Sequence, residues 1–242
     1  MKRIFVAPAW LTVLVLAACG GESQLPEATG EGTVRSINAI RTSPSISFLI
    51  EERVINTVDY KTGTSLATYD DLDYTFNFDA FLAGDTEITR IGSQFLDVVR
   101  DTTYTFVIRG DLANPTISVW ERPVPEFADG ATSFEVQVGH LATSLGDIDV
   151  YFADPATPPA LGNAVGTLTE GEVLPISSFE AGDYVLTITH AGDPATVRFE
   201  SDTLTVNGGN AYLFTAFDAD ERDVAPIAMR RFNMGFSNST RI

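Results

Sequence analysis

The sequence predicts an all-β protein made of two tandem immunoglobulin-like antiparallel β-sandwich domains. Three observations support this. Apolar residues alternate with polar ones through most of the chain after residue 32, Gly, Pro, Asn and Asp separate the alternating stretches, and no segment has the apolar stripe of a ten-residue amphipathic helix. Many short strands joined by turns are typical of a sandwich or barrel. With 44% hydrophobic residues and 16 Phe, the chain can form packed cores.

The predicted strands form two groups. Those of the first half cover residues 34–40, 46–50, 74–78, 104–108 and 117–119, and those of the second half cover 134–138, 148–152, 184–188 and 204–206. Their alternation predicts strands with one buried and one solvent-exposed face. Between the groups, the segment ERPVPEFADGATS holds two prolines, a glycine and several charges, which is typical of an interdomain linker.

These breaks give the expected domain limits. We place the first domain at residues 33–122, the linker at 123–133 and the second domain at 134–232. The remaining residues, 233–242, form a C-terminal tail that we expect to extend the last strand or to cover a sheet edge.

The two halves can be aligned with each other. Val34, Asp73, Tyr104 and Pro115 correspond to residues of the same type at offsets of 102, 110, 108 and 111. A nearly constant offset at four landmarks predicts an internal duplication.

The first residues are typical of an export signal. Two basic residues precede an apolar run at 4–16, and small residues lead to Cys19, the only cysteine in the chain. The run is shorter than the roughly 20 residues that span a bilayer, so we expect residues 1–18 to be removed as a signal peptide. The sequence Leu16-Ala-Ala-Cys19 resembles the lipobox of a bacterial lipoprotein, which implies cleavage before Cys19 and acylation of its thiol.

Residues 19–32 are then the lipid anchor and a flexible tether, because GGESQLPEATGEG has no apolar periodicity. These 13 residues after Cys19 have a root-mean-square reach on the order of 20 Å. Gly20 stands where an inner-membrane retention signal has Asp, so the resemblance implies the outer membrane rather than the inner one. The leaflet stays open.

The charge of the chain excludes some partners. Without Lys2 and Arg3, 13 basic residues remain against 33 acidic ones, a net charge of −20. Such a surface argues against nucleic acid and against direct adsorption to anionic lipid headgroups. We therefore expect contact with the membrane through the lipid anchor, and an envelope protein or a glycan as a further partner.

Candidate sites for chemistry are few. His140 and His190 lack the partners of a catalytic triad or a zinc site, and we expect no catalytic residue and no cofactor. Asp218, Asp220 and Asp223 are the candidates for a cation site, because Asp-x-Asp loops suit calcium, and solvated loop acids are the alternative. Aromatic side chains can stack on sugars, and we name the residue at the strand end before the linker, Trp120, as the exposed ligand-binding candidate.

The second half carries a further resemblance. Val138-Gly-His-Leu-Ala142, Asp147-Ile-Asp-Val-Tyr151 and Ala181-Gly-Asp-Tyr184 resemble a bacterial lipoprotein domain family of unknown function that commonly occurs as tandem repeats. In the first half, Asn38-Ala39 replaces the His-Ala element, so a family role of His140 could not be shared there. The resemblance implies a β-sandwich at the cell envelope, with no established chemistry.

The sequence therefore predicts a non-enzymatic, lipid-anchored cell-envelope protein that acts as a structural or binding module. One alternative is a carbohydrate-binding or surface-polymer-binding protein, which an aromatic platform in a groove would favour. The other is a hydrolase with an unrecognised acidic site, which a buried carboxylate pair in a pocket would favour.

Overall fold

The computed structural model describes residues 27–221, 223, 226–235 and 240–241, and it confirms the all-β fold class. The predicted signal peptide, Cys19 and most of the tether lie outside the described residues. Within the described residues, no helix is long and apolar enough to cross a membrane.

The first sandwich consists of two four-stranded sheets, in the orders β4-β1-β7-β8 and β3-β2-β5-β6. Its strands are β1 (Glu31–Asn38), β2 (Ile46–Ile50), β3 (Arg53–Val58), β4 (Ala67–Asp70), β5 (Asp73–Phe81), β6 (Ile88–Asp97), β7 (Thr102–Asp111) and β8 (Asn114–Pro123). The facing sides of the two sheets enclose an aromatic core in which Phe48, Phe76 and Phe106 contact one another.

The second sandwich consists of sheets in the orders β12-β9-β16-β17-β18 and β11-β10-β13-β14, with β15 paired to β13. Its strands are β9 (Ser133–Leu141), β10 (Ile148–Ala153), β11 (Gly166–Leu168), β12 (Ser177–Glu180), β13 (Gly182–His190), β14 (Asp193–Glu200), β15 (Leu204–Val206), β16 (Ala211–Asp218), β17 (Ile227–Asn233) and β18 (Thr240–Arg241). Strand β18 pairs with β17 and thereby places part of the predicted tail at the edge of its sheet.

Corresponding strands of the two sandwiches pair in the same register. Strand β1 runs parallel to β7 with Thr33 opposite Thr103, and β9 runs parallel to β16 with Glu135 opposite Ala211. All other strand pairs are antiparallel. The parallel pairs refine the predicted antiparallel sandwich, because alternation within a strand carries no information about the direction of its neighbour.

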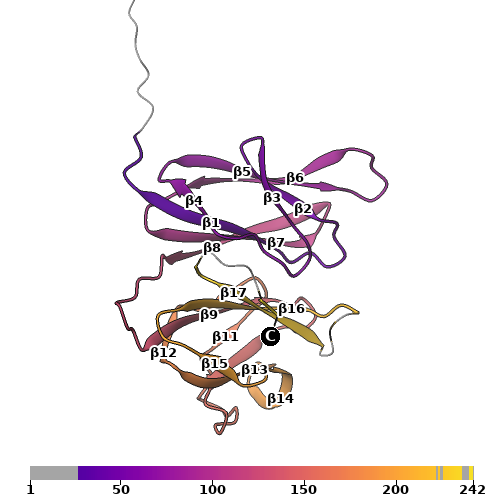
Figure 1. The fold of residues 1–242 in the computed structure, drawn as a ribbon. Coiled ribbons are helices and arrows are strands. Elements are labelled where there is room, and N and C mark those ends of the chain that lie inside the picture. The colour runs from indigo at the N-terminus through magenta and orange to yellow at the C-terminus, as the bar shows by residue number, and fades with distance from the viewer. Residues whose placement is uncertain (1–26, 222, 224–225, 236–239, 242) are drawn as a thin grey trace, which may run out of the picture.

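The four sheets form one stack (Figure 1), in which the sheet of β1 faces the sheet of β9. A third apolar cluster fills the space between these two inner sheets, with Val107 and Trp120 from one side and Leu213 and Phe232 from the other. Strands β1, β7, β9 and β16 are consequently buried on both faces. The predicted solvent-exposed face is wrong for these strands, because the other sandwich covers it.

Candidate functional site at the junction of the two sandwiches

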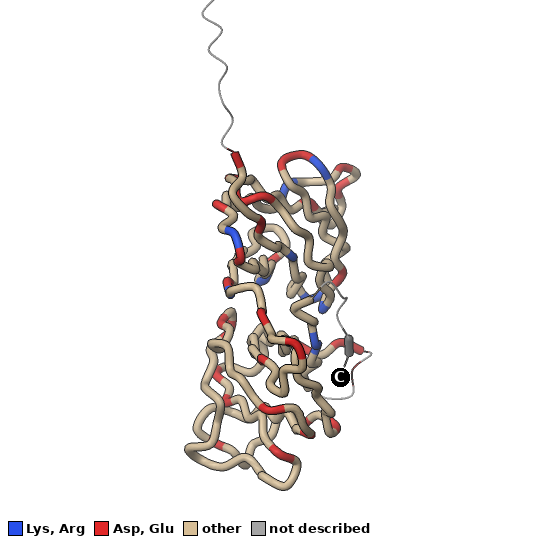
Figure 2. The backbone as a smooth tube through the Cα atoms, turned by 60° about the vertical axis from the view of Figure 1, so that its left-hand side comes forward, with Lys and Arg blue, Asp and Glu red and all other residues tan. Residues whose placement is uncertain are grey.

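Two of the candidate sites fall on one surface. Trp120 and the acidic group at 218–223 both lie between the two inner sheets, a region that we call the junction. Figure 2 shows acidic residues over both sandwiches, with several basic residues where the sandwiches meet. Residues that the sequence presents as two separate surface sites therefore both belong to the contact region between the sandwiches, where each set has partners of its own.

Trp120 is a buried residue of the junction. Its side chain lies against Gly139, and its Nε1 donates a hydrogen bond to the carbonyl oxygen of Gly171 at 3.0 Å. Only 8% of the residue is exposed. The prediction of an exposed tryptophan for sugar stacking is wrong, because the second sandwich covers the end of β8 on which Trp120 stands.

Asp218 closes a turn of its own sandwich. Its carboxylate accepts hydrogen bonds from the backbone N–H groups of Thr143 and Ser144 at 3.1 and 3.0 Å, and from the Thr143 hydroxyl at 2.7 Å. Burial alone would raise the pKa of Asp218, but these hydrogen bonds outweigh it and hold the pKa below its usual value. The oxygens of this carboxylate are thus already hydrogen-bonded to the turn between β9 and β10.

Asp220 and Asp223 bind a lysine of the other sandwich. Lys61 Nζ lies 2.8 Å from the Asp220 carboxylate and also forms an ion pair with Asp223. The lysine is 2% exposed, so this is a buried ion pair. Burial opposes ionisation of Asp223, but the hydrogen bond and charge of Lys61 lower its pKa overall.

The geometry differs from the predicted cation site. A lysine ammonium occupies the position between Asp220 and Asp223, and the Asp218 carboxylate is directed to Thr143 and Ser144. In the described part of the chain, no group of three or more His, Cys, Asp or Glu residues could hold a metal ion. The cation beside Asp220 and Asp223 is therefore the ammonium of Lys61, and the calcium site at residues 218–223 stays a prediction that this geometry does not support.

A second ion pair crosses the junction on the other side. Arg109 Nη1 lies 2.8 and 3.1 Å from the two carboxylate oxygens of Glu170. Both side chains are partly exposed, at 24% and 29%, so this pair is more strongly screened by water than the Lys61 pair. Arg122 forms a third ion pair with Glu135.

Arg35 is a junction residue that the sequence did not identify. It is 1% exposed, and its Nη2 donates to the carbonyl oxygen of Asn233 at 2.8 Å and to Met234 Sδ at 3.0 Å. Its guanidinium lies 5.9 Å from the centre of the Phe232 ring. Burial, reinforced by the positive charge of Arg122, lowers the pKa of Arg35 to about 9. No sequence pattern signals this contact, because the partners are 198 residues away.

His140 stabilises a turn. Its Nδ1 accepts a hydrogen bond from the Ala142 N–H at 3.3 Å, and its Nε2 lies 2.8 Å from the Gly146 carbonyl oxygen, to which it donates. Asn38 occupies the corresponding place in β1, where its Oδ1 accepts from the Ile40 N–H at 2.9 Å. The first half therefore has the same hydrogen bond at this turn, because an amide oxygen can replace the imidazole nitrogen.

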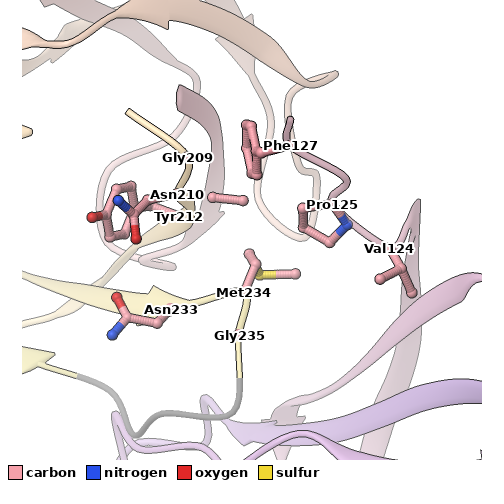
Figure 3. A pocket seen from close by; sticks show the side chains of 10 residues that line it. Val124, Pro125, Phe127, Gly209, Asn210, Tyr212, Asn233, Met234 and Gly235 are labelled. Atoms are coloured by element: carbon pink, nitrogen blue, oxygen red, sulfur yellow. The ribbon is translucent and has the colours of Figure 1, made fainter. Parts of the chain in front are cut away.

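Two pockets flank the junction. One, of about 480 Å³, lies beneath the segment that connects the sandwiches, and no charged residue lines it. Figure 3 shows Phe127, Pro125 and Met234 around it. The other, of about 530 Å³, is lined by Arg41, Thr42, Ser43, Tyr60, Asp220 and Glu221.

The lining of the two pockets bears on the alternative of an acidic hydrolase, which stays a prediction. A general acid of that type needs a carboxyl group whose pKa is raised. The first pocket has no carboxylate in its lining, and the second is lined by Asp220, which binds Lys61, and by Glu221. The nearby carboxyl groups of Asp218 and Asp223 have lowered pKa values. The arrangement is suited to holding the sandwiches together.

Comparison with known proteins adds one family. No curated protein matches the chain. A family model matches residues 32–151, from β1 into β10, which includes Val138–Ala142 and Asp147–Tyr151 but not Ala181–Tyr184. The chain therefore contains a DUF4397 domain, a domain of unknown function, at residues 32–151.

Proposed function

We propose that the protein is a non-enzymatic, lipid-anchored component of the cell envelope that presents a stiff two-sandwich body as a structural or binding module. The observation that carries this proposal is the junction, where an apolar cluster and the buried Lys61 ion pair join the two sandwiches. Domains joined only by a linker move independently, whereas a large apolar interface restrains them. The body is therefore suited to hold one surface at a defined distance from another.

The tether enters at one end of this body. Asp71 accepts hydrogen bonds from the N–H groups of Thr29 and Gly30 at 2.6 and 3.0 Å and from the Thr29 hydroxyl at 2.5 Å. With a lipid on Cys19, nine residues would separate the anchor from this contact at Thr29, a root-mean-square reach of about 17 Å for a flexible chain. The first sandwich would then lie near the membrane, and the second would be presented away from it.

The proposal includes an origin by duplication. The strands correspond with offsets of 102 residues for β1 and β9 and 108 residues for β7 and β16, and the pairing register is the same in both sandwiches. Equal register across several strand pairs supports a tandem repeat, because unrelated sandwiches need not share it.

The anchor is tested by fractionation of cells that express the full chain. Wild-type protein is expected in the membrane fraction, preferably the outer membrane, and Cys19→Ser in the soluble envelope fraction. Because more than one acyl chain makes attachment stable, high salt should not release the wild type. Equal sedimentation of the two proteins with membranes would contradict the anchor.

The stiffness is tested separately, by the distance between spin labels on the two sandwiches. Labels at Ser93 in β6 and Asn163 in the second sandwich are expected to give one narrow distance distribution. A broad distribution would contradict a stiff body while leaving the anchor untouched.

A further inference from the structure

The junction is built from contacts that occur in equivalent pairs. The loop after β3 in the first sandwich and the loop after β11 in the second hold equivalent places. The Lys61 N–H donates to the Asn38 carbonyl oxygen at 2.9 Å, and the Gly171 N–H donates to the His140 carbonyl oxygen at 2.7 Å. Lys61 therefore corresponds to Gly171, and Tyr60 before it corresponds to Glu170.

Each loop reaches the same place on the opposite sandwich. Tyr60 packs against Phe217 with ring centres 6.2 Å apart, and Glu170 pairs with Arg109 at 2.8 Å. The registers of β7 and β16 make Arg109 the counterpart of Phe217. The two contacts are therefore equivalent: exchange of the two sandwiches converts the Tyr60–Phe217 contact into the Glu170–Arg109 contact.

Two more contacts follow the same rule. A Cβ at Gly63 would lie 3.0 Å from the Phe232 ring, and Val173, the counterpart of Gly63, lines a small cavity together with Trp120. The pairing of β7 with β8 and of β16 with β17 makes Trp120 the counterpart of Phe232. The indole and the phenyl ring thus hold equivalent positions on opposite sides of the junction.

Such reciprocity defines an isologous interface, in which residue i of one unit contacts residue j of the other and j contacts i. It is the arrangement by which two copies of one domain form a symmetric dimer. We infer that the inner sheet of the first sandwich, β4-β1-β7-β8, is a docking surface like that of a symmetric dimer. Its partner is the second sandwich of the same chain, and the two sandwiches stay associated without the connecting segment.

The side chains make this pairing specific. If a first sandwich met a second copy of itself, Tyr60 would face Arg109. Lys61 would meet the short β7–β8 turn, where the single exposed carboxylate of Asp111 stands in place of the pair Asp220 and Asp223. If the second sandwich met a copy of itself, Glu170 would lie against Phe217. A buried charge without its partner opposes association, so the opposite charges at Lys61 and Glu170 select the mixed pair.

The experiment uses the full chain from residue 20 with a site-specific protease sequence inserted at Ala128–Gly130, three exposed residues of the connecting segment. After cleavage, the two fragments are expected to elute together as one 1:1 complex in gel filtration at micromolar concentration. Separate elution of wild-type fragments, or homodimers of either fragment, would overturn the inference.

Charge reversal tests the specificity in the same cleaved protein. Arg109→Glu faces Glu170 with a like charge and is expected to weaken the complex at least about tenfold. Adding Glu170→Arg should restore the affinity in the double variant, and because this rescue requires folded fragments it separates lost specificity from misfolding. An unchanged affinity in the single variant, or no rescue in the double variant, would contradict the role of the charges.

Discussion

The ring of Trp120 lies directly on the backbone of Gly139. A Cβ atom at residue 139 would come within 2.4 Å of Trp120 Cη2 and 2.7 Å of Cζ3. The ring cannot retreat easily, because its Nε1 is bonded to the Gly171 carbonyl oxygen. The absence of a side chain at residue 139 thus allows the inner sheets to approach each other at this point of the junction.

Gly139→Ala should therefore destabilise the protein. Overpacking of a filled interior typically costs about 1–3 kcal/mol, and we expect a decrease of that size in the free energy of unfolding by urea. The matched control is Gly182→Ala in β13, where the nearest atom to an added Cβ lies 3.7 Å away. If both variants were equally stable, the close packing of Trp120 on Gly139 would be refuted.

Trp120 also reports on the junction. The chain has two tryptophans, and the other, Trp10, belongs to the predicted signal peptide. A chain that begins at residue 20 should show the blue-shifted emission of a buried indole and little quenching by iodide. Lys61→Met should shift the emission to the red and increase quenching, whereas unchanged emission would argue that the junction does not depend on this lysine.

Lys61→Met should also lower the stability strongly. It leaves Asp220 and Asp223 without the ammonium that they bind, and removal of one partner of a buried ion pair costs about 3–5 kcal/mol. Arg90→Met is the control, because Arg90 pairs with Glu52 and Asp79 at the surface of the first sandwich and such pairs contribute about 0–1 kcal/mol. Thermal unfolding of the two variants should differ accordingly, and equal losses would contradict the special role of Lys61.

The sequence predicted the strands better than it predicted their surroundings. Residues 46–50 and 204–206 agree with β2 and β15 because strand alternation is a local property. Strands such as β6 and β14 were not predicted. Strand β6 lies at a sheet edge, where exposed residues alternate with half-buried ones. Strand β14 contains Pro194, and its pairing with β13 has register shifts. The expected fold class did not depend on these strands.

The junction could not be predicted because its determinants are distant in sequence. The polar residues Arg35 and Asn38 make β1 look like a strand with one solvent-exposed face. Asn233, which contacts the buried Arg35, lies 198 residues further along the chain. The same holds for Lys61 and Asp223, which are 162 residues apart. A composition-based linker at 123–133 also gives no information on whether the domains that it joins pack together.

Asp71→Ala should release the start of the described chain. In the wild type, the amides of Thr29 and Gly30 donate to the Asp71 carboxylate, whose pKa is lowered chiefly by the hydrogen bond from the Thr29 hydroxyl. Hydrogen exchange at these two amides is expected to accelerate in the variant. Asp70→Ala, at the neighbouring exposed position in β4, is the control and should leave their exchange unchanged.

His140→Asn should make the stability less dependent on pH between 7 and 5. Burial lowers the pKa of His140 below 6.5, since the imidazole is buried in its neutral form and its Nδ1 accepts the Ala142 N–H. The unfolded chain binds the proton more readily, so the contribution of His140 is complete above pH 6.5 and is lost as the pH falls toward the folded-state value. Asparagine, which Asn38 shows to fit the same position, does not titrate.

The His140→Asn variant should have a flatter curve of unfolding free energy against pH between pH 7 and 5. Its stability at pH 7 should be lower by about 1 kcal/mol, because it loses the hydrogen bond to the Gly146 carbonyl oxygen. Below about pH 4 both proteins should lose stability, because the lowered pKa values of Asp218 and Asp223 stabilise the folded state only while these groups are ionised. His190→Asn, at an exposed position at the end of β13, is the matched control. A slope that changes equally in both variants would show that the buried imidazole is not the titrating group.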